Sequence, residues 1–166
     1  VGAFPTSIEH VDFLCADSHK WMLGPAAAGI FYVKEKHFEI LQPTLHGAWN
    51  VKAPDFVARE QIEYESGGRR YDPGVLNFSG IFGMRAAINL INEIGVDNIA
   101  TRILTLKKYL LTGLQARGFL IQPPTQGDSA SGITTFEKED AAWMRQCFRH
   151  LTKNRVATSL RSDRQG

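Results

Sequence analysis

Cysteine is scarce in this sequence, since only Cys15 and Cys147 occur among its 166 residues. Their positions give neither a disulfide framework nor the spacing of a metal-ligand set, so we expect no structural disulfide and no metal site. Long apolar runs are also missing, and the first residues show no basic segment followed by an apolar stretch. We therefore expect neither export nor membrane insertion, and a place in the reducing cytoplasm.

An excess of charge of one sign is missing as well. The 19 Lys and Arg residues against 17 Asp and Glu residues leave a formal net charge of +2. The tightest basic groups, Arg69-Arg70 and Lys107-Lys108, are simple pairs without interleaved aromatic residues. We therefore expect no nucleic-acid partner. The length allows one ordinary domain or parts of two domains that share an interface.

The first part of the chain predicts two strands followed by a long connection. Residues 11–16 and 27–33 are rich in β-forming side chains, and Gly24-Pro25 between them cannot continue a strand. Residues 42–75 show weak periodicity and are repeatedly interrupted by glycine and proline. So long a connection is uncommon unless it has a function.

Beyond residue 75, apolar residues at helical spacing predict helices that begin at polar N-cap residues and stop at glycines. The predicted elements are a helix from Asn77 or Ser79 to Gly95, a helix from Asp97 to Gly118, strands at 119–122 and 133–136, a helix from about Asp140, and a strand at 156–160. This order is typical of a small α+β domain, distinct from the strand pair at the start.

Lys20 follows directly on the first predicted strand, in the segment Ser18-His19-Lys20-Trp21. A lysine at a strand end supplies an amine for an aldehyde cofactor when its neighbours and partial burial help it to lose a proton. Ser18 and His19 add hydrogen-bonding groups of the kind that a phosphate accepts. An isolated tetrapeptide of this kind is more often an ordinary turn, so the wider sequence decides.

Two longer segments carry a family resemblance. Residues 11–25 (VDFLCADSHKWMLGP) resemble the lysine region of class V aminotransferases, a family that includes cysteine desulfurases and isopenicillin N epimerase-like proteins. Residues 70–77 (RYDPGVLN) resemble that family's Arg-aromatic-acid-x-Gly-Thr-x-Asn stretch, in the same order along the chain. The resemblance implies an α/β fold, that of the fold-type I transferases dependent on pyridoxal 5'-phosphate (PLP). Residues 1–80 would be the end of the large domain, and residues 81–166 the linking helix and most of the small α+β C-terminal domain.

By this resemblance Lys20 carries the internal aldimine with PLP, while Ser18 and His19 lie beside the cofactor. Gly74 and Val75 approach the phosphate of the partner subunit's cofactor, which implies a homodimer with shared active sites. Lys20 then moves a proton at the Cα of an amino-acid substrate. Transamination, epimerisation, desulfuration and elimination all remain open. The alternative is a partial, non-catalytic scaffold or dimer module of the same family.

The sequence departs from the family pattern at three positions. Val75 replaces the usual Thr, which removes a hydroxyl donor to phosphate and keeps the backbone N–H. Asp17 replaces a small residue, and an anion there opposes a phosphate unless it turns away or is paired. Ala27 replaces a frequent glycine. The Asp that pairs with the pyridine nitrogen and the Arg that binds the substrate carboxylate are expected outside this chain.

Three further residues are weighed as site candidates. His46 and Trp49, in the long connection, are interpreted as packing or surface residues, with a place at the substrate entrance as the alternative. Cys147 shares the spacing of the apolar residues of the third predicted helix, so we expect it on the buried face. We therefore do not assign it the role of a sulfur-transferring thiol.

Overall fold

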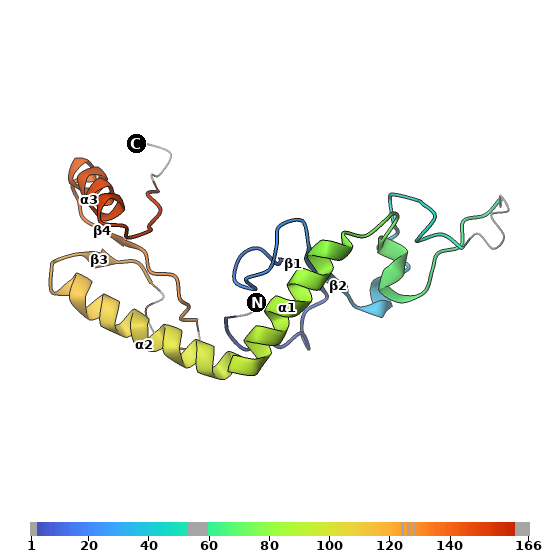
Figure 1. The fold of residues 1–166 in the computed structure, drawn as a ribbon, viewed down its shortest axis with the longest axis horizontal. Helices are drawn as coiled ribbons and strands as arrows, with labels where there is room; N and C mark the ends of the chain where they lie inside the picture. The colour runs from blue at the N-terminus through green and yellow to red at the C-terminus, as the bar shows by residue number, and fades with distance from the viewer. Residues whose placement is uncertain (1–2, 53–59, 124, 126, 128, 162–166) are drawn as a thin grey trace. The chain divides into compact units, whose positions relative to one another are not determined.

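The computed structural model describes residues 3–52, 60–123, 125, 127 and 129–161. The chain divides into two compact units, Val1–Ala100 and Thr101–Gly166. Figure 1 shows the elements, which in chain order are β1 (Phe13–Asp17), β2 (Gly29–Val33), the 3-10 helices η1 (Glu35–His37) and η3 (Gly67–Tyr71), α1 (Phe78–Ile94), α2 (Val96–Gln115), β3 (Leu120–Ile121), β4 (Phe136–Glu137) and α3 (Ala141–Lys153). The assignment of residues 1–80 and 81–166 to two domains stays a prediction.

The two strands predicted near the start form an antiparallel hairpin. Phe13 pairs with Val33 at one end of the ladder, and Asp17 pairs with Gly29 at the other. A side chain on Gly29 would place its Cβ 2.8 Å from the carbonyl oxygen of Ala16, so glycine lets the returning strand approach closely. Residues 18–28 connect the two strands, and we call this connection the Lys20 loop.

The predicted helix boundaries are set by capping residues. The Asn77 side chain accepts the N–H of Gly80 at 3.0 Å and so begins α1. Gly95 ends α1 with a φ of +86°, a conformation that favours glycine, and α2 follows directly. Asp140 caps α3 by accepting two backbone N–H groups at 2.8 and 3.0 Å. All three predicted helices are therefore confirmed.

The short sheet of the second unit is smaller than the sequence predicts. β3 lies within the predicted range 119–122, whereas β4 begins only at the last residue of the predicted range 133–136. The two strands pair antiparallel, and the N–H of Gln122 adds one more bond to the carbonyl of Thr135 at 3.0 Å. The prediction is right about the pairing elements and wrong about where β4 starts.

The strand predicted at residues 156–160 is wrong, because the structure has no regular element there. The chain leaves α3 through Arg155, whose φ is +61°, and the N–H of Val156 returns to the carbonyl of Leu151 at 2.9 Å. Apolar β-forming residues make a strand only when a neighbouring strand supplies ladder bonds. Among the described residues, none pairs with this segment.

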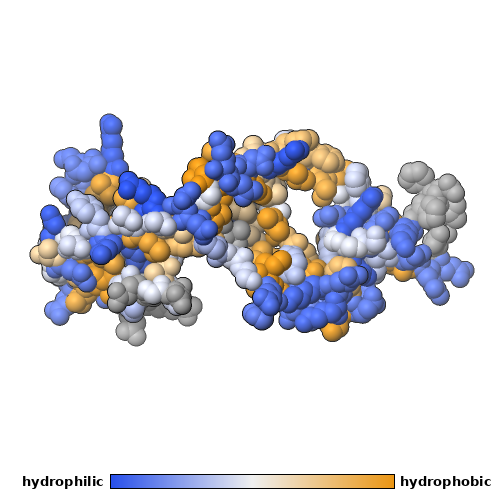
Figure 2. All heavy atoms as spheres, turned by 90° about the horizontal axis from the view of Figure 1, so that it is seen from below, coloured by the Kyte–Doolittle hydropathy of each residue, from blue (hydrophilic) through white to orange (hydrophobic). Residues whose placement is uncertain are grey.

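Few apolar side chains are buried in the described part of the chain. The buried ones are Ala3, Met22, Ile91 and Ala100. Large apolar residues such as Phe13 and Phe31 of the hairpin are about half exposed, and Figure 2 shows hydrophobic atoms on the visible surface of the molecule. Among these, Met22 belongs to the Lys20 loop, where it is 3% exposed.

Candidate functional site

Ser18 closes the Lys20 loop from inside. Its side chain is fully buried and donates its hydroxyl hydrogen to the carbonyl oxygen of Pro25. Its backbone N–H donates to Ala28 at 3.0 Å, and its carbonyl accepts the N–H of Gly24 at 2.8 Å. A Cβ on Gly24 would lie 2.8 Å from the Ser18 Cβ, so this packing requires glycine there. These contacts give Ser18 a structural role, and its predicted place beside a cofactor stays a prediction.

His19, Lys20 and Trp21 point outward where Ser18 and Met22 point inward. The Lys20 side chain is 69% exposed, and its Nζ lies 3.7 Å from the carboxylate of Asp17, which is 60% exposed. The expectation that the Lys20 amine is partly buried is therefore wrong, because most of this side chain is exposed in the single chain. The sequence raised the question of whether the Asp17 anion is paired, and the structure pairs it with Lys20.

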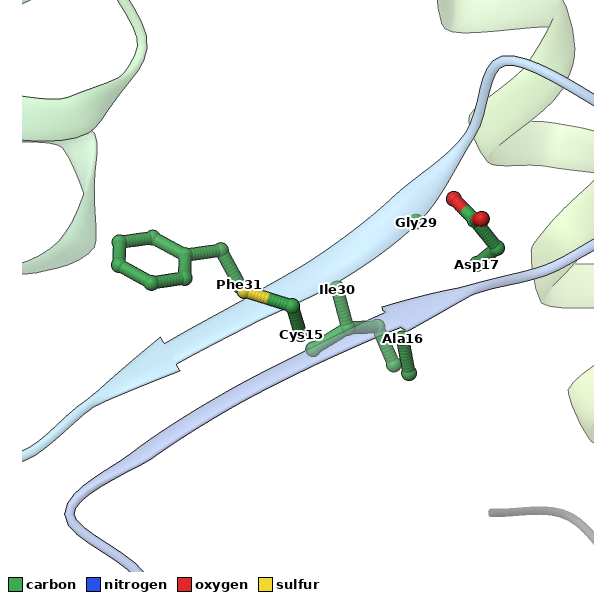
Figure 3. A pocket seen from close by; sticks show the side chains of 6 residues that line it. All are labelled: Cys15, Ala16, Asp17, Gly29, Ile30 and Phe31. Atoms are coloured by element: carbon green, nitrogen blue, oxygen red, sulfur yellow. The ribbon is translucent and has the colours of Figure 1, made fainter. Parts of the chain in front are cut away.

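An open depression of about 300 Å³ lies on the hairpin next to this loop. It is lined by Cys15, Ala16, Asp17, Gly29, Ile30 and Phe31. Figure 3 shows Asp17 and Phe31 on one face of the hairpin and Ile30 and Ala16 on the other, as the strand alternation requires. Lys20 does not line the depression, so we do not equate it with a cofactor site.

The second predicted cofactor segment ends in an open turn at Gly74 and Val75. Both residues are exposed, and a Cβ on Gly74 would meet nothing within 4 Å. Among the described residues, neither backbone N–H donates a hydrogen bond to a protein acceptor. Two free N–H groups and open space are what an incoming phosphate needs, even without the hydroxyl that Val75 lacks.

A buried asparagine holds this turn from behind. The Asn50 side chain is fully buried, and its Nδ2 donates to the carbonyls of Leu45 at 2.8 Å and Arg70 at 3.0 Å. Its Oδ1 accepts the N–H of Gly47 at 2.9 Å, and a Cβ on Gly47 would collide with the Pro73 carbonyl oxygen. The segment around Gly47 and Asn50 therefore packs against Pro73, the residue before Gly74. Sequence reasoning missed Asn50, since no local pattern marks a polar residue whose bond to Arg70 spans 20 residues.

His46 and Trp49 belong to the same packed connection. The Nε2 of His46 lies 2.9 Å from the hydroxyl of Tyr64, and the two rings stack. The carbonyl of Trp49 accepts the Nε–H of Arg69 at 3.0 Å, and the guanidinium lies 5.7 Å from the centre of the indole ring. These contacts support the packing interpretation of both residues.

The Lys20 loop also packs on the start of α1. A Cβ on Gly83 would lie 3.0 Å from the Pro25 ring, and one on Gly80 would lie 3.1 Å from the Cβ of Ala28. Figure 1 shows α1 beside the hairpin in the first unit. The structure thus brings the segment that contains Lys20 against the helix that follows the Gly74 turn.

Other kinds of site find no support in the described residues. None of the described helices is both long and apolar enough to cross a bilayer. The described histidines, cysteines and acidic residues form no cluster able to hold a metal ion. Cys147 lies half-buried on α3, as do Met144, Phe148 and Leu151, so the face predicted from the spacing is the less exposed one but is not fully buried.

Comparison with known proteins gives a family match over most of the chain. The family model described as Aminotransferase class-V matches residues 6–160. Probable cysteine desulfurases from Pyrococcus abyssi and Halalkalibacterium halodurans are 27% and 29% identical over 125 and 130 residues, or 75% and 78% of this chain. The chain spans 30% of the length of each of these two relatives.

Solved structures agree in fold. The apo cysteine desulfurase from Thermococcus onnurineus NA1 matches 88% of this chain with a TM-score of 0.76 and 24% identity, over 38% of its own length. A lysine variant of C-DES with glycine covalently linked to its PLP cofactor matches 94% of this chain with a TM-score of 0.75 and 19% identity, over 40% of its own length. The predicted fold class is therefore confirmed.

Proposed function

The chain belongs to the aminotransferase class-V family, and from this premise we propose that Lys20 serves a PLP-dependent site that transforms an amino acid. The observation that carries the proposal is the Lys20 loop, in which a buried serine fixes the backbone and leaves a primary amine accessible at the end of β1. A primary amine is the group that an aldehyde cofactor requires. Because the chain spans only part of its relatives, the activity proposed is that of the whole protein.

Each residue of the proposed site has a distinct task. Lys20 would hold the aldehyde, and its amine, once released, would be the base placed to take a proton from the substrate Cα and return it. His19, exposed beside it, is a hydrogen-bonding partner for the cofactor. When bound, PLP supplies the electron sink that stabilises negative charge at Cα. The Asp17 carboxylate must release the amine before any of this occurs, since the two groups form an ion pair.

The phosphate is proposed to be held by Gly74 and Val75 of a second copy of the chain. Their exposed N–H groups and the open space at Gly74 fit an anion that approaches from outside the chain. In this arrangement a homodimer completes two sites, each with Lys20 from one subunit and the Gly74 turn from the other. Val75 lacks the hydroxyl of the family's usual threonine, so backbone groups carry this contact.

The substrate class follows from the relatives. The two similar proteins reported above are named probable cysteine desulfurases, which makes cysteine the first candidate substrate and desulfuration the first candidate outcome. Half-buried Cys147 is not proposed as the thiol that accepts sulfur. Release of alanine from cysteine distinguishes desulfuration from transamination, epimerisation and elimination.

The experiment that tests the proposal is a titration of the purified protein with PLP, followed by the visible absorbance of the bound cofactor. Lys20→Arg is expected to abolish this absorbance, because a guanidinium does not condense with the aldehyde. Lys36→Arg is the matched control, since Lys36 is 62% exposed and also pairs with an aspartate, at 3.0 Å. Equal absorbance in wild type and Lys20→Arg would refute the proposal.

The competing function is a non-catalytic scaffold or dimer module. The observation that favours it is the openness of Lys20, which the described part of the chain does not enclose. A scaffold is expected to remain folded and self-associated, and to show no cofactor absorbance in wild type, Lys20→Arg or Lys36→Arg. The same titration, read together with light scattering, therefore decides between the two functions.

A further inference from the structure

Asn77 joins the two segments that the proposed function needs. Its Nδ2 donates to the carbonyl oxygen of Ala27 at 3.1 Å, across 50 residues of sequence. Its Oδ1 accepts the N–H of Gly80 at 3.0 Å and caps α1. One amide group therefore fixes both the end of the Lys20 loop and the start of the helix that follows the Gly74 turn. We call the bond from Asn77 to Ala27 the Asn77 bridge.

Close packing makes the bridge consequential. Gly80 and Gly83 have no side chains to hold α1 away from Ala28 and Pro25, and a Cβ on either glycine would come within 3.1 Å of the loop. A Cβ on Gly24 would also reach the α1 backbone at 3.4 Å. The loop therefore rests on the helix with little free space between them. A shift of the loop must change its contacts with α1.

The backbone at Ala27 needs external support. Its φ of +60° lies in the left-handed region, which is unfavourable for a residue with a Cβ. A conformation of this kind persists where the surroundings determine it. The Asn77 bridge holds the carbonyl of this residue, and the neighbouring Ala28 carbonyl accepts the N–H of Ser18 at 3.0 Å. The restraint therefore passes from Asn77 to the residue two positions before Lys20.

We propose that Asn77 is a positioning residue that holds the Lys20 loop in the geometry from which Lys20 reacts, an inference that rests on the proposed function. Asn77 lies three residues after Gly74, so the same side chain also links the amine segment to the phosphate segment. It touches neither the cofactor nor the substrate in this role. Its effect on Lys20 is transmitted through Ala27 and Ser18.

Capping and bridging can be separated by substitution. Asn77→Asp and Asn77→Ser keep a good N-cap for α1, because Asp, Ser and Asn are comparable there. Both remove the Nδ2 donor, and the aspartate also sets a carboxylate oxygen against the Ala27 carbonyl. Asn98→Asp is the matched control, since its Nδ2 likewise donates to a backbone carbonyl, that of Ile94, at 2.7 Å. Circular dichroism is expected to show unchanged helix content in all three variants.

The first readout needs no cofactor. Amide hydrogen exchange of Ser18 and Gly24 reports loop closure, because their N–H groups donate to Ala28 and to Ser18 itself. Loss of one hydrogen bond is expected to speed exchange at these amides about fivefold in both Asn77 variants. The Asn98→Asp control is expected to exchange at these amides like wild type.

The second readout is the reaction of Lys20 with PLP, trapped with borohydride and mapped to the modified lysine. In both Asn77 variants, PLP is expected to label Lys20 several-fold more slowly than in wild type, and the pH profile of labelling is expected to shift. Lower stability alone does not produce a shifted pH profile. If both variants exchange these amides and label Lys20 at the wild-type rates, the inference is overturned. If wild type itself does not label Lys20, the proposed function fails and the positioning role fails with it. That result differs from failure of the inference alone, in which wild type and the variants label equally.

Discussion

Replacing Asp17 by asparagine probes how the ion pair restrains Lys20. The two charged groups lie 3.7 Å apart, and both side chains are well exposed. Two unit charges about 4 Å apart attract by about 1 kcal/mol in water, and exposed ion pairs are typically worth about 0.2–1 kcal/mol. The neutral amine is the form that attacks an aldehyde, so the ammonium must first lose its proton, and this loss breaks the ion pair. Asp17→Asn is therefore expected to speed condensation by up to about fivefold.

Two aldehydes separate the two effects of the Asp17 charge. Pyridoxal has no phosphate, so its reaction reports only the ion pair with Lys20. Pyridoxal phosphate also meets repulsion between its phosphate and the Asp17 carboxylate, so Asp17→Asn is expected to speed its reaction by a larger factor. Stopped-flow absorbance gives both rates. About 1 M salt is expected to reduce both gains, because it screens charges beyond about 3 Å.

The matched control is Glu63→Gln, which removes a carboxylate from a 2.6 Å ion pair with Lys52 elsewhere in the first unit. It is expected to leave the rates with both aldehydes unchanged. Equal rates for wild type and Asp17→Asn with both aldehydes would refute the reasoning. A gain of the same size in Glu63→Gln would also refute it, since the effect would then follow net charge.

Two further predictions concern the hairpin and the Lys20 loop. Ala27→Gly relieves a φ of +60°, so urea unfolding is expected to show up to about 1 kcal/mol more stability, whereas Ala26→Gly lowers it. Hydrogen bonds from Lys36 and His37 lower the pKa of the Asp12 carboxyl. The ionised Asp12 therefore stabilises the folded chain above about pH 4, and this stabilisation is lost as the pH falls through the lowered pKa. Asp12→Asn is expected to reduce this pH dependence of the free energy of unfolding, measured by urea unfolding at a series of pH values.

The fold was most predictable where local chemistry decides it. Asn77 and Gly95 bound α1 because a capping side chain and a left-handed glycine act within one helical turn. The hairpin follows from two β-forming runs with Gly24-Pro25 between them. The strand at 156–160 failed because its formation depends on a partner strand, which local sequence does not specify.

The candidate site was less predictable in its orientation than in its location. The resemblance located Lys20 and Gly74, but it did not indicate that Ser18 turns fully inward and bonds to Pro25. Nor did any pattern indicate that Asn50 supports the Gly74 turn, because its bonds reach up to 20 residues along the chain. The positive φ at Ala27 gives a physical reason for a preference for glycine at that position.

The most direct test of the account is a peptide map of the protein after reaction with PLP and reduction by borohydride. Lys20 and Lys36 have similar exposure, 69% and 62%, so accessibility alone predicts similar modification of both. We predict that the pyridoxyl group is found on the peptide that contains Lys20, with Lys36 largely unmodified. Equal modification of the two lysines, or none at Lys20 in the folded protein, would contradict it.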